Sequence, residues 1–151
     1  MQLQGSCHCG AVQFEVDAPH PVPFNLCYCS ICRKTAGGGG YAINVGAKAN
    51  SLEVSGREHM RTYASSENME RTFCGNCGSA LWAYSPKWPE LLHPHASAID
   101  TEIPAAPERT HLMLGSRAAW AEPIIGENDK TFDAYPDESL QAWHERMGMV
   151  S

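Results

Sequence analysis

Apolar and polar residues alternate along several short segments of the chain, a pattern typical of half-buried β-strands. Residues 11–16 (AVQFEV) place Val12, Phe14 and Val16 on one face of such a strand. The same alternation predicts further short strands at residues 41–45, 51–54, 80–84, 96–99 and 110–114. Strands therefore dominate the predicted structure.

The strand pattern also predicts one shared face and one hairpin. Tyr41, Ile43 and Val45 are expected to lie on the same face of their strand, because side chains repeat every second residue. Residues 60–65 (MRTYAS) and 70–73 (ERTF) flank a polar turn, which indicates a β-hairpin.

Helical signals occur in two places. Ser30 is the expected N-cap of a short helix that includes Cys32. Near the C-terminus, Leu140, Trp143 and Met147 share one face of a helical pattern, which predicts a short amphipathic helix docked on the sheet.

Short strands separated by glycine, proline, asparagine and serine favour a mainly β fold, of the all-β sandwich or barrel-like kind. Trp82, Trp120 and Trp143 are expected to pack into its core. No linker-like segment divides the chain, so residues 1–151 are predicted to form a single domain.

Composition and charge narrow the classes of function. The chain has 151 residues, 43% hydrophobic and 19% charged, as in a soluble globular protein. The net charge of −6 argues against general nucleic-acid binding, which needs clustered lysine and arginine. There is no apolar run of membrane-spanning length, and the first ten residues lack the features of a secretory signal. We therefore expect a cytoplasmic protein with reduced thiols and no membrane partner.

Seven cysteines fall into three groups of close neighbours. In a reducing compartment they indicate metal binding or thiol chemistry rather than disulfides. Cys74 and Cys77 form a C-x-x-C turn with glycine, which can place two thiolates on one zinc ion. Cys7 and Cys9 are the favoured partners of that pair, and the four thiolates together would make a closed structural site.

The remaining cysteines, Cys27, Cys29 and Cys32, are close enough in sequence to wrap around one ion. Three protein ligands leave a coordination position for water or substrate, the pattern of a catalytic zinc. A histidine that closes the triad is an open alternative, and the candidates are His8, His59, His93, His95 and His111. Iron–sulfur ligation is disfavoured, because no fourth cysteine stands at ferredoxin-type spacing.

A different partition of the cysteines is also compatible with their spacing, although it is less favoured. In that partition one ion is shared by Cys7, Cys9, Cys27 and Cys29, and the other is left with Cys32, Cys74 and Cys77.

The residues after the triad offer positive charge and an open backbone. Arg33 and Lys34 can offset the excess negative charge of three thiolates or receive a substrate carboxylate, or they can be ordinary surface residues. Gly37–Gly40 allow close approach of the backbone to a ligand, or simply form a flexible connection.

Together the cysteines and their flanking residues resemble the glutathione-dependent formaldehyde-activating enzyme family, which also includes a domain of centromere protein V. The resemblance spans roughly residues 3–135. The matching stretches, in family order, are GSCHCGAVQFEV (5–16), CYCSICRK (27–34), RTFCGNCGSALW (71–82), AID (98–100) and HLMLGSRAAW (111–120).

The resemblance implies a single zinc-binding domain with a β-tent fold of short antiparallel strands, to which the pattern above adds a short C-terminal helix. It implies two zinc ions per chain. The structural ion would be held by Cys7, Cys9, Cys74 and Cys77. The catalytic ion would be held by Cys27, Cys29 and Cys32.

The family reaction is the addition of glutathione to formaldehyde, which gives S-hydroxymethylglutathione and is classed as a carbon–sulfur lyase activity. The resemblance therefore implies small-molecule partners, glutathione and an aldehyde. Our own hypothesis is that Arg33 or Lys34 holds a glutathione carboxylate. The sequence departs from the common family pattern at Ala119, where proline often precedes the tryptophan, and at His93-Pro94-His95. The alternatives are a different thiol or carbonyl lyase on the same scaffold, and a non-catalytic zinc-binding interaction module.

Overall fold

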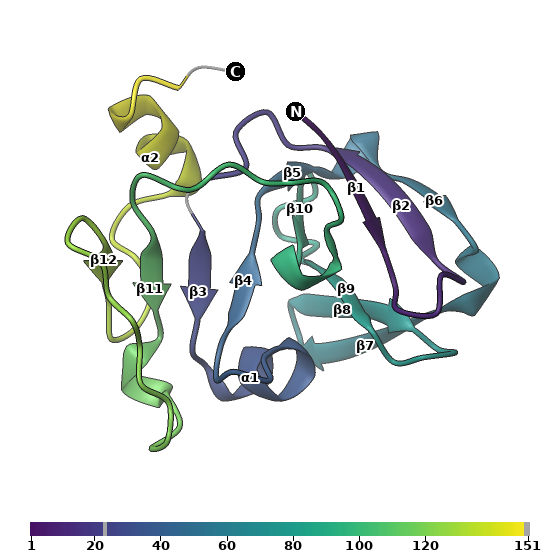
Figure 1. Ribbon diagram of the computed structural model, residues 1–151, viewed down its shortest axis with the longest axis horizontal. Coiled ribbons are helices and arrows are strands. Elements are labelled where there is room, and N and C mark those ends of the chain that lie inside the picture. The colour runs from purple at the N-terminus through teal and green to yellow at the C-terminus, as the bar shows by residue number, and fades with distance from the viewer. Residues whose placement is uncertain (23, 150–151) are drawn as a thin grey trace. The chain divides into compact units, whose positions relative to one another are not determined.

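The computed structural model describes residues 1–22 and 24–149 and arranges them in two compact units. The first unit joins Met1–Pro21 with Val45–Ile103, and the second joins Val22–Asn44 with Pro104–Ser151. Each unit contains short β-strands, and across the described residues strands outnumber helices, which confirms the mainly β prediction (Figure 1). Within the described residues, no helix combines the length and the apolar character needed to cross a membrane. The organisation of residues 1–151 as a single domain stays a prediction.

The first unit contains a three-stranded antiparallel sheet in the order β1-β2-β6. Its strands are β1 (Gln2–Ser6), β2 (Gln13–Asp17) and β6 (Glu53–Ser55). Val12, Phe14 and Val16 are buried, as their alternation with polar residues predicted. The Phe14 ring meets Trp82 edge-on, with 5.2 Å between the ring centroids, so Trp82 belongs to the core as predicted.

The first unit also contains a five-stranded antiparallel sheet in the order β5-β10-β9-β8-β7. Its strands are β5 (Ala47–Lys48), β10 (Leu91–Pro94), β9 (Ala80–Tyr84), β8 (Met69–Cys74) and β7 (Met60–Ser66). The predicted hairpin is formed by β7 and β8, and β9 has the predicted bounds. Leu3, Leu81 and Leu92 pack with the buried residues of β2 in one core.

The strand predicted at residues 96–99 is wrong. Residues Ala96–Ala98 form the 3-10 helix η3, and the strand of this region of the first unit is β10, which ends at Pro94 before the predicted strand begins. The N–H of His95 donates to the carbonyl of Leu81, which is the last bond to β9. The N–H of Ala98 then donates to the carbonyl of His95, so the backbone closes into a turn instead of extending. Two further 3-10 helices, η1 (Ala49–Ser51) and η2 (Arg57–His59), flank β6.

The second unit contains a four-stranded sheet in the order β12-β11-β3-β4 (Figure 1). Its strands are β12 (Lys130–Thr131), β11 (Thr110–Leu112), β3 (Asn25–Cys27) and β4 (Ala42–Asn44). Contrary to a purely antiparallel arrangement, β11 runs parallel to both β3 and β12, and only β3 and β4 are antiparallel. Beyond β11, Met113 adopts a positive φ of 59°, so the predicted strand 110–114 ends early and the 3-10 helix η4 (Leu114–Ser116) begins.

Side chains of the segment that includes β3 divide between two small cores. Leu26 and Tyr28 are buried with Leu114 on one side, and Tyr41 and Ile43 pack against them. The predicted shared face of Tyr41 and Ile43 is therefore observed. The third predicted member, Val45, lies beyond β4 and is buried in the core of the first unit.

Two short helices complete the second unit. They are α1 (Ser30–Ala36), which follows β3, and α2 (Leu140–Arg146), which is the predicted C-terminal helix. Trp143 of α2 is buried, and its indole N–H donates to Glu108 over 3.1 Å. Arg146 forms ion pairs with Glu108 at 2.9 Å and with Glu138 at 2.8 Å, which fastens the last turn of α2.

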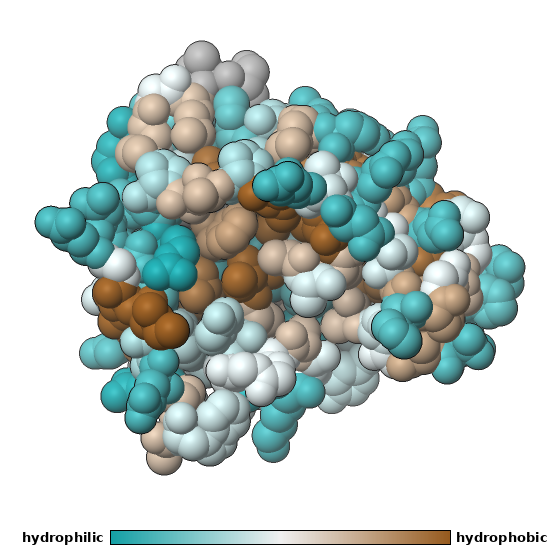
Figure 2. All heavy atoms as spheres, in the orientation of Figure 1, coloured by the Kyte–Doolittle hydropathy of each residue, from teal (hydrophilic) through white to brown (hydrophobic). Residues whose placement is uncertain are grey.

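Trp120 was expected in the core, but its side chain is 63% exposed. It lies in the irregular segment between η4 and β12, where the backbone of residues 117–129 forms neither helix nor strand. Ile124 and Ile125 of the same segment are also exposed. Figure 2 shows a hydrophobic patch on this side of the unit, over the region of β11 and β12. Apolar composition alone therefore did not indicate burial in this segment.

Candidate metal centres

Two turns of the first unit carry four of the cysteines. Cys7 follows β1, and Cys74 ends β8. The N–H of Gly10 donates to the carbonyl of Cys7 over 3.1 Å, and that of Gly78 donates to the carbonyl of Cys74 over 2.7 Å. Both glycines have positive φ, a backbone conformation in which a residue with a side chain would be strained. Each closed turn therefore brings its two cysteine sulfurs to the same side.

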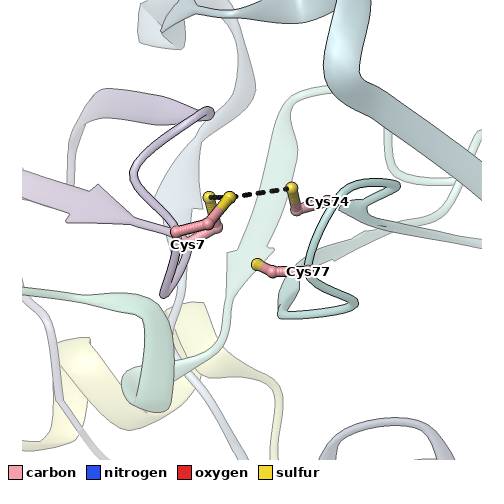
Figure 3. A group of neighbouring side chains, drawn as sticks. Cys7, Cys74 and Cys77 are labelled. Atoms are coloured by element: carbon pink, nitrogen blue, oxygen red, sulfur yellow. Dashed lines mark hydrogen bonds between the residues drawn. The ribbon is translucent and has the colours of Figure 1, made fainter.

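The four sulfurs of Cys7, Cys9, Cys74 and Cys77 lie within 4.8 Å of one another. The Sγ atoms of Cys7 and Cys9 are 3.6 Å apart, and those of Cys9 and Cys74 are 3.9 Å apart. In a tetrahedral site with zinc–sulfur bonds of about 2.3 Å, neighbouring sulfurs are about 3.8 Å apart. Figure 3 shows the labelled side chains of Cys7, Cys74 and Cys77 directed toward one another from the two turns. The arrangement fits a four-thiolate metal site.

Polar neighbours favour the thiolate form at the outer side of this cluster. The side-chain amide of Asn76 donates to the sulfur of Cys9 over 3.2 Å and lowers the pKa of Cys9. The hydroxyl of Ser79 lies 3.2 Å from the sulfur of Cys77 and lowers the pKa of Cys77 to about 5. Burial raises the pKa of Cys7. Thiolate is the form that ligates a metal, so the surroundings of Cys9 and Cys77 suit that role.

The other three cysteines come together in the second unit. Cys27 is the last residue of β3, Cys29 precedes α1, and Cys32 lies in the first turn of α1. Their sulfurs lie within 4.8 Å of one another, with Cys27 and Cys32 buried and Cys29 half-buried. The structure thus groups the seven cysteines as four and three, and the alternative partition is wrong.

Cys29, and not Ser30, is the N-cap of α1. Its backbone is extended, with ψ of 158°, and its sulfur accepts a hydrogen bond from the N–H of Cys32 over 3.3 Å. The prediction missed this because oxygen-bearing side chains are the usual caps. A triad sulfur therefore occupies the position where backbone N–H groups point at an acceptor.

Protonation of the three thiols is strongly linked. The thiols of Cys27 and Cys32, with the N–H groups at the start of α1, lower the pKa of Cys29 to about 2. The same neighbourhood, mainly the Cys29 and Cys32 sulfurs and then burial, raises the pKa of Cys27 well above its usual range. Three thiolates at these distances repel one another, and a divalent cation offsets that repulsion. The donor set fits a metal ion such as zinc.

One histidine that was considered as a fourth ligand has its ring nitrogens engaged elsewhere. Nδ1 of His111 is 3.0 Å from the hydroxyl of Tyr28, and Nε2 is 2.9 Å from a carboxylate oxygen of Asp129. Within the described residues of the second unit, no further cysteine, histidine or acidic ligand atom joins the three sulfurs. The other candidates, His8, His59, His93 and His95, belong to the first unit, and their role as ligands stays a prediction.

Arg33 and Lys34 follow the triad in α1, as predicted. Arg33 is half-buried and Lys34 is exposed. The Nε of Arg33 is buried and has no hydrogen-bond partner among the described residues. A buried donor without an acceptor is costly, so this nitrogen is suited to meet an anionic group. After α1, Gly38 and Gly39 leave open space where a side chain would stand.

Sequence reasoning missed the polar residues that support these sulfurs. Asn76 and Ser79 lie inside or next to the C-x-x-C turn, so the turn itself could have indicated them. Tyr28 lies between two cysteines, but its partner His111 is 83 residues away along the chain, and Asp129, the partner of His111, lies 18 residues beyond that. No local motif connects such positions.

Two clusters of cysteine sulfurs on a scaffold of short β-strands define a cysteine-rich class of mainly β protein with sulfur groups that can hold metal ions. Residues 2–115 match the family described as glutathione-dependent formaldehyde-activating enzyme. The chain belongs to this family.

Individual relatives agree with the family match. A Halomonas elongata protein, whose name proposes a glutathione-dependent formaldehyde-activating enzyme, is 56% identical over 99% of this chain and 98% of its own length. An uncharacterized lyase of Schizosaccharomyces pombe is 32% identical over 54% of this chain and 56% of its own length. The crystal structure of a Rhodobacter sphaeroides protein is similar with a TM-score of 0.57 and 29% identity, over 69% of this chain and 92% of that one.

Proposed function

We propose that this protein is a zinc-dependent carbon–sulfur lyase whose synthetic direction adds the thiol of glutathione to formaldehyde. In that direction the S–H bond breaks, a carbon–sulfur bond forms, and the carbonyl π bond becomes a C–O single bond. The proton ends on that oxygen, so the product is S-hydroxymethylglutathione and no redox partner is needed. The family and the names of two relatives support this activity.

The observation that carries the proposal is the contrast between the two sulfur clusters. One offers four sulfurs, which can saturate a tetrahedral ion, and the other offers three from its own unit. We assign a structural zinc to Cys7, Cys9, Cys74 and Cys77, and a catalytic zinc to Cys27, Cys29 and Cys32. When bound to the triad, zinc supplies Lewis-acid chemistry at the position that the three sulfurs leave open.

The chain's own residues would bind and orient the substrate beside the triad. Arg33 is suited to receive a glutathione carboxylate, because its buried Nε has no partner among the described residues. Lys34 is exposed and adds positive charge next to it. Ala42 and Leu112 pack against the triad and limit the access of water to it. Thiol ligands need reducing surroundings, so we place the protein in the cytoplasm.

A specific observation favours a second candidate, a different thiol or carbonyl lyase on the same scaffold. The relative from Schizosaccharomyces pombe is named as a lyase without a stated substrate. A non-catalytic zinc module predicts a triad closed by a protein ligand, or an empty triad. The described part of the second unit supplies no such ligand, so the closed form of this alternative is less favoured.

The experiment is an NMR exchange measurement of the glutathione–formaldehyde adduct with the zinc-loaded protein. We expect faster exchange with the wild-type protein and with Lys87→Ala, a surface control, than with no protein. Cys29→Ser should return the rate to that of the uncatalysed reaction. No acceleration by a wild-type protein that holds two zinc ions would refute this substrate pair.

A further inference from the structure

A buried network of polar side chains, here called the polar chain, begins at Tyr28, between the triad residues Cys27 and Cys29. The hydroxyl of Tyr28 meets Nδ1 of His111 at 3.0 Å, and Nε2 of His111 meets Asp129 at 2.9 Å. Tyr28 is 1% exposed, His111 is 0% exposed and the Asp129 side chain is 7% exposed. The rings of Tyr28 and His111 are also stacked, with centroids 5.8 Å apart. Three polar side chains buried together are stabilising only when they satisfy one another.

Alternation along the chain links this polar chain to the metal ligands. In an extended segment, successive side chains point to opposite sides. Cys27 and Cys29 lie in the small core that contains Cys32 and Ala42, whereas Tyr28 lies in the other core. A hydrogen bond from the N–H of Tyr28 to the carbonyl of Leu112 holds the backbone between them at 3.1 Å. The direction of the Tyr28 side chain therefore sets the direction of both neighbouring sulfurs.

The far end of the polar chain is firmly held. Asp129 accepts hydrogen bonds from the N–H of Gly126 at 2.9 Å and from the N–H and Nε of Arg109 at 3.0 and 3.1 Å. Burial would raise the pKa of Asp129, but these bonds and the one from His111 outweigh burial and hold the pKa well below its usual range. A carboxylate only accepts hydrogen bonds, so Nε2 of His111 donates to it. When the His111 ring is neutral, its Nδ1 then accepts a hydrogen bond from the Tyr28 hydroxyl. Both hydrogen bonds therefore run the same way, from Tyr28 through His111 to Asp129.

We propose that Tyr28, His111 and Asp129 are positioning residues that hold Cys27 and Cys29 in the geometry that binds the triad metal. This inference rests on the proposed function to the extent that the triad holds an ion. A site with three protein ligands depends on such support, because there is no fourth ligand to keep the ion when one sulfur turns away. An apolar side chain at position 28 would fill the core equally well but would leave rotation of the segment less restricted.

The test compares Tyr28→Phe with the matched control Tyr41→Phe. Both changes remove one hydroxyl from the same core, where the two rings lie 5.2 Å apart. The metal affinity of each cluster is measured by chelator competition, and the triad geometry by the absorption spectrum of the cobalt-substituted protein. We expect Tyr28→Phe to lower the metal affinity of one of the two sites by about 10- to 100-fold. Losses of this size follow the removal of residues that support metal ligands at other sites. The second ion and the control variant should be unchanged, and the cobalt spectrum should shift only in Tyr28→Phe.

Asp129→Asn gives a second measurement. It should shift the cobalt spectrum in the same direction as Tyr28→Phe, and the double variant should lose less affinity than the sum of the two, because both act through His111. Unchanged triad affinity and spectrum in Tyr28→Phe, with two ions bound to the wild-type protein, would overturn this inference alone. A wild-type protein that binds one ion per chain would overturn both the inference and the proposed function.

Discussion

Replacement of one ligand in each cluster should separate the two metal sites by their effect on stability. Cys74→Ser removes a ligand from a site that joins two distant turns, whereas Cys29→Ser removes one from a site formed within a single segment. Each change replaces one sulfur by an oxygen that ligates zinc less well. We expect each variant to lose the ion from its own site, and only Cys74→Ser to unfold readily.

The size of the difference follows from the length of chain that each site closes. Cys9 and Cys74 are 65 residues apart, and a cross-link over such a loop stabilises the folded state by about 4 kcal/mol through the entropy of the unfolded chain. Cys29 and Cys32 are 3 residues apart, and the same relation gives less than about 2 kcal/mol. A domain is stabilised by about 5–15 kcal/mol in total, so loss of the first site removes a large share.

The assay is thermal unfolding of the zinc-loaded variants, with zinc content measured on the same samples. A loss of 4 kcal/mol corresponds to a decrease in Tm of roughly 10–15 °C for a chain of this size. Cys29→Ser should remain folded at temperatures where Cys74→Ser is unfolded, and should lack activity. Equal decreases in Tm, or a larger decrease for Cys29→Ser, would refute the assignment of the structural role to the four-cysteine cluster.

Three further predictions concern stability. Leu81→Ala, at a fully buried position of the first core, should lower the free energy of unfolding by about 3 kcal/mol in urea titrations, and a loss below about 1 kcal/mol would show that the site is not tightly packed. Burial, with the charge of Arg71, lowers the pKa of His95 to about 4, so the folded state favours the neutral ring. The stability that the neutral His95 ring contributes should therefore be fully present above pH 6.5, and the free energy of unfolding should decrease by about 2 kcal/mol as the pH falls from 7 to 5. A His95→Gln variant with the same pH dependence would contradict this cause. Trp143→Phe removes the hydrogen bond to Glu108 and should cost about 1 kcal/mol, measured by the same titration, whereas an unchanged midpoint would mean that this bond adds nothing to stability.

The parts of the fold that the sequence predicted are those with local causes. Val12, Phe14 and Val16 alternate because one face of β2 is buried, and that pattern needs no knowledge of the partner strand. The triad was predictable because Cys27 and Cys32 lie within one strand–helix connection, where chain geometry already brings them together.

The parts that the sequence did not predict depend on distant partners. Residues 96–99 have a strand-like composition, but a hydrogen bond from His95 to Leu81 decides where β10 ends. Trp120 is exposed although its side chain is apolar, because burial depends on which surface an irregular segment happens to cover. The partnership of Tyr28 with His111 spans 83 residues and leaves no periodic signal.

The order in which the chain visits the two units has a consequence for biosynthesis. The chain passes from one unit to the other after Pro21, after Asn44 and after Ile103, so neither unit is a continuous stretch of sequence. On the ribosome, Cys7 and Cys9, in the turn between β1 and β2, must wait until Cys74 and Cys77 have emerged before the four sulfurs can come together. The second unit cannot be completed until β11 and α2 have left the exit tunnel, long after β3 and α1 have done so. Neither unit can be obtained by simple truncation, and nascent chains carry Cys7 and Cys9 without their partners until Cys77 has emerged.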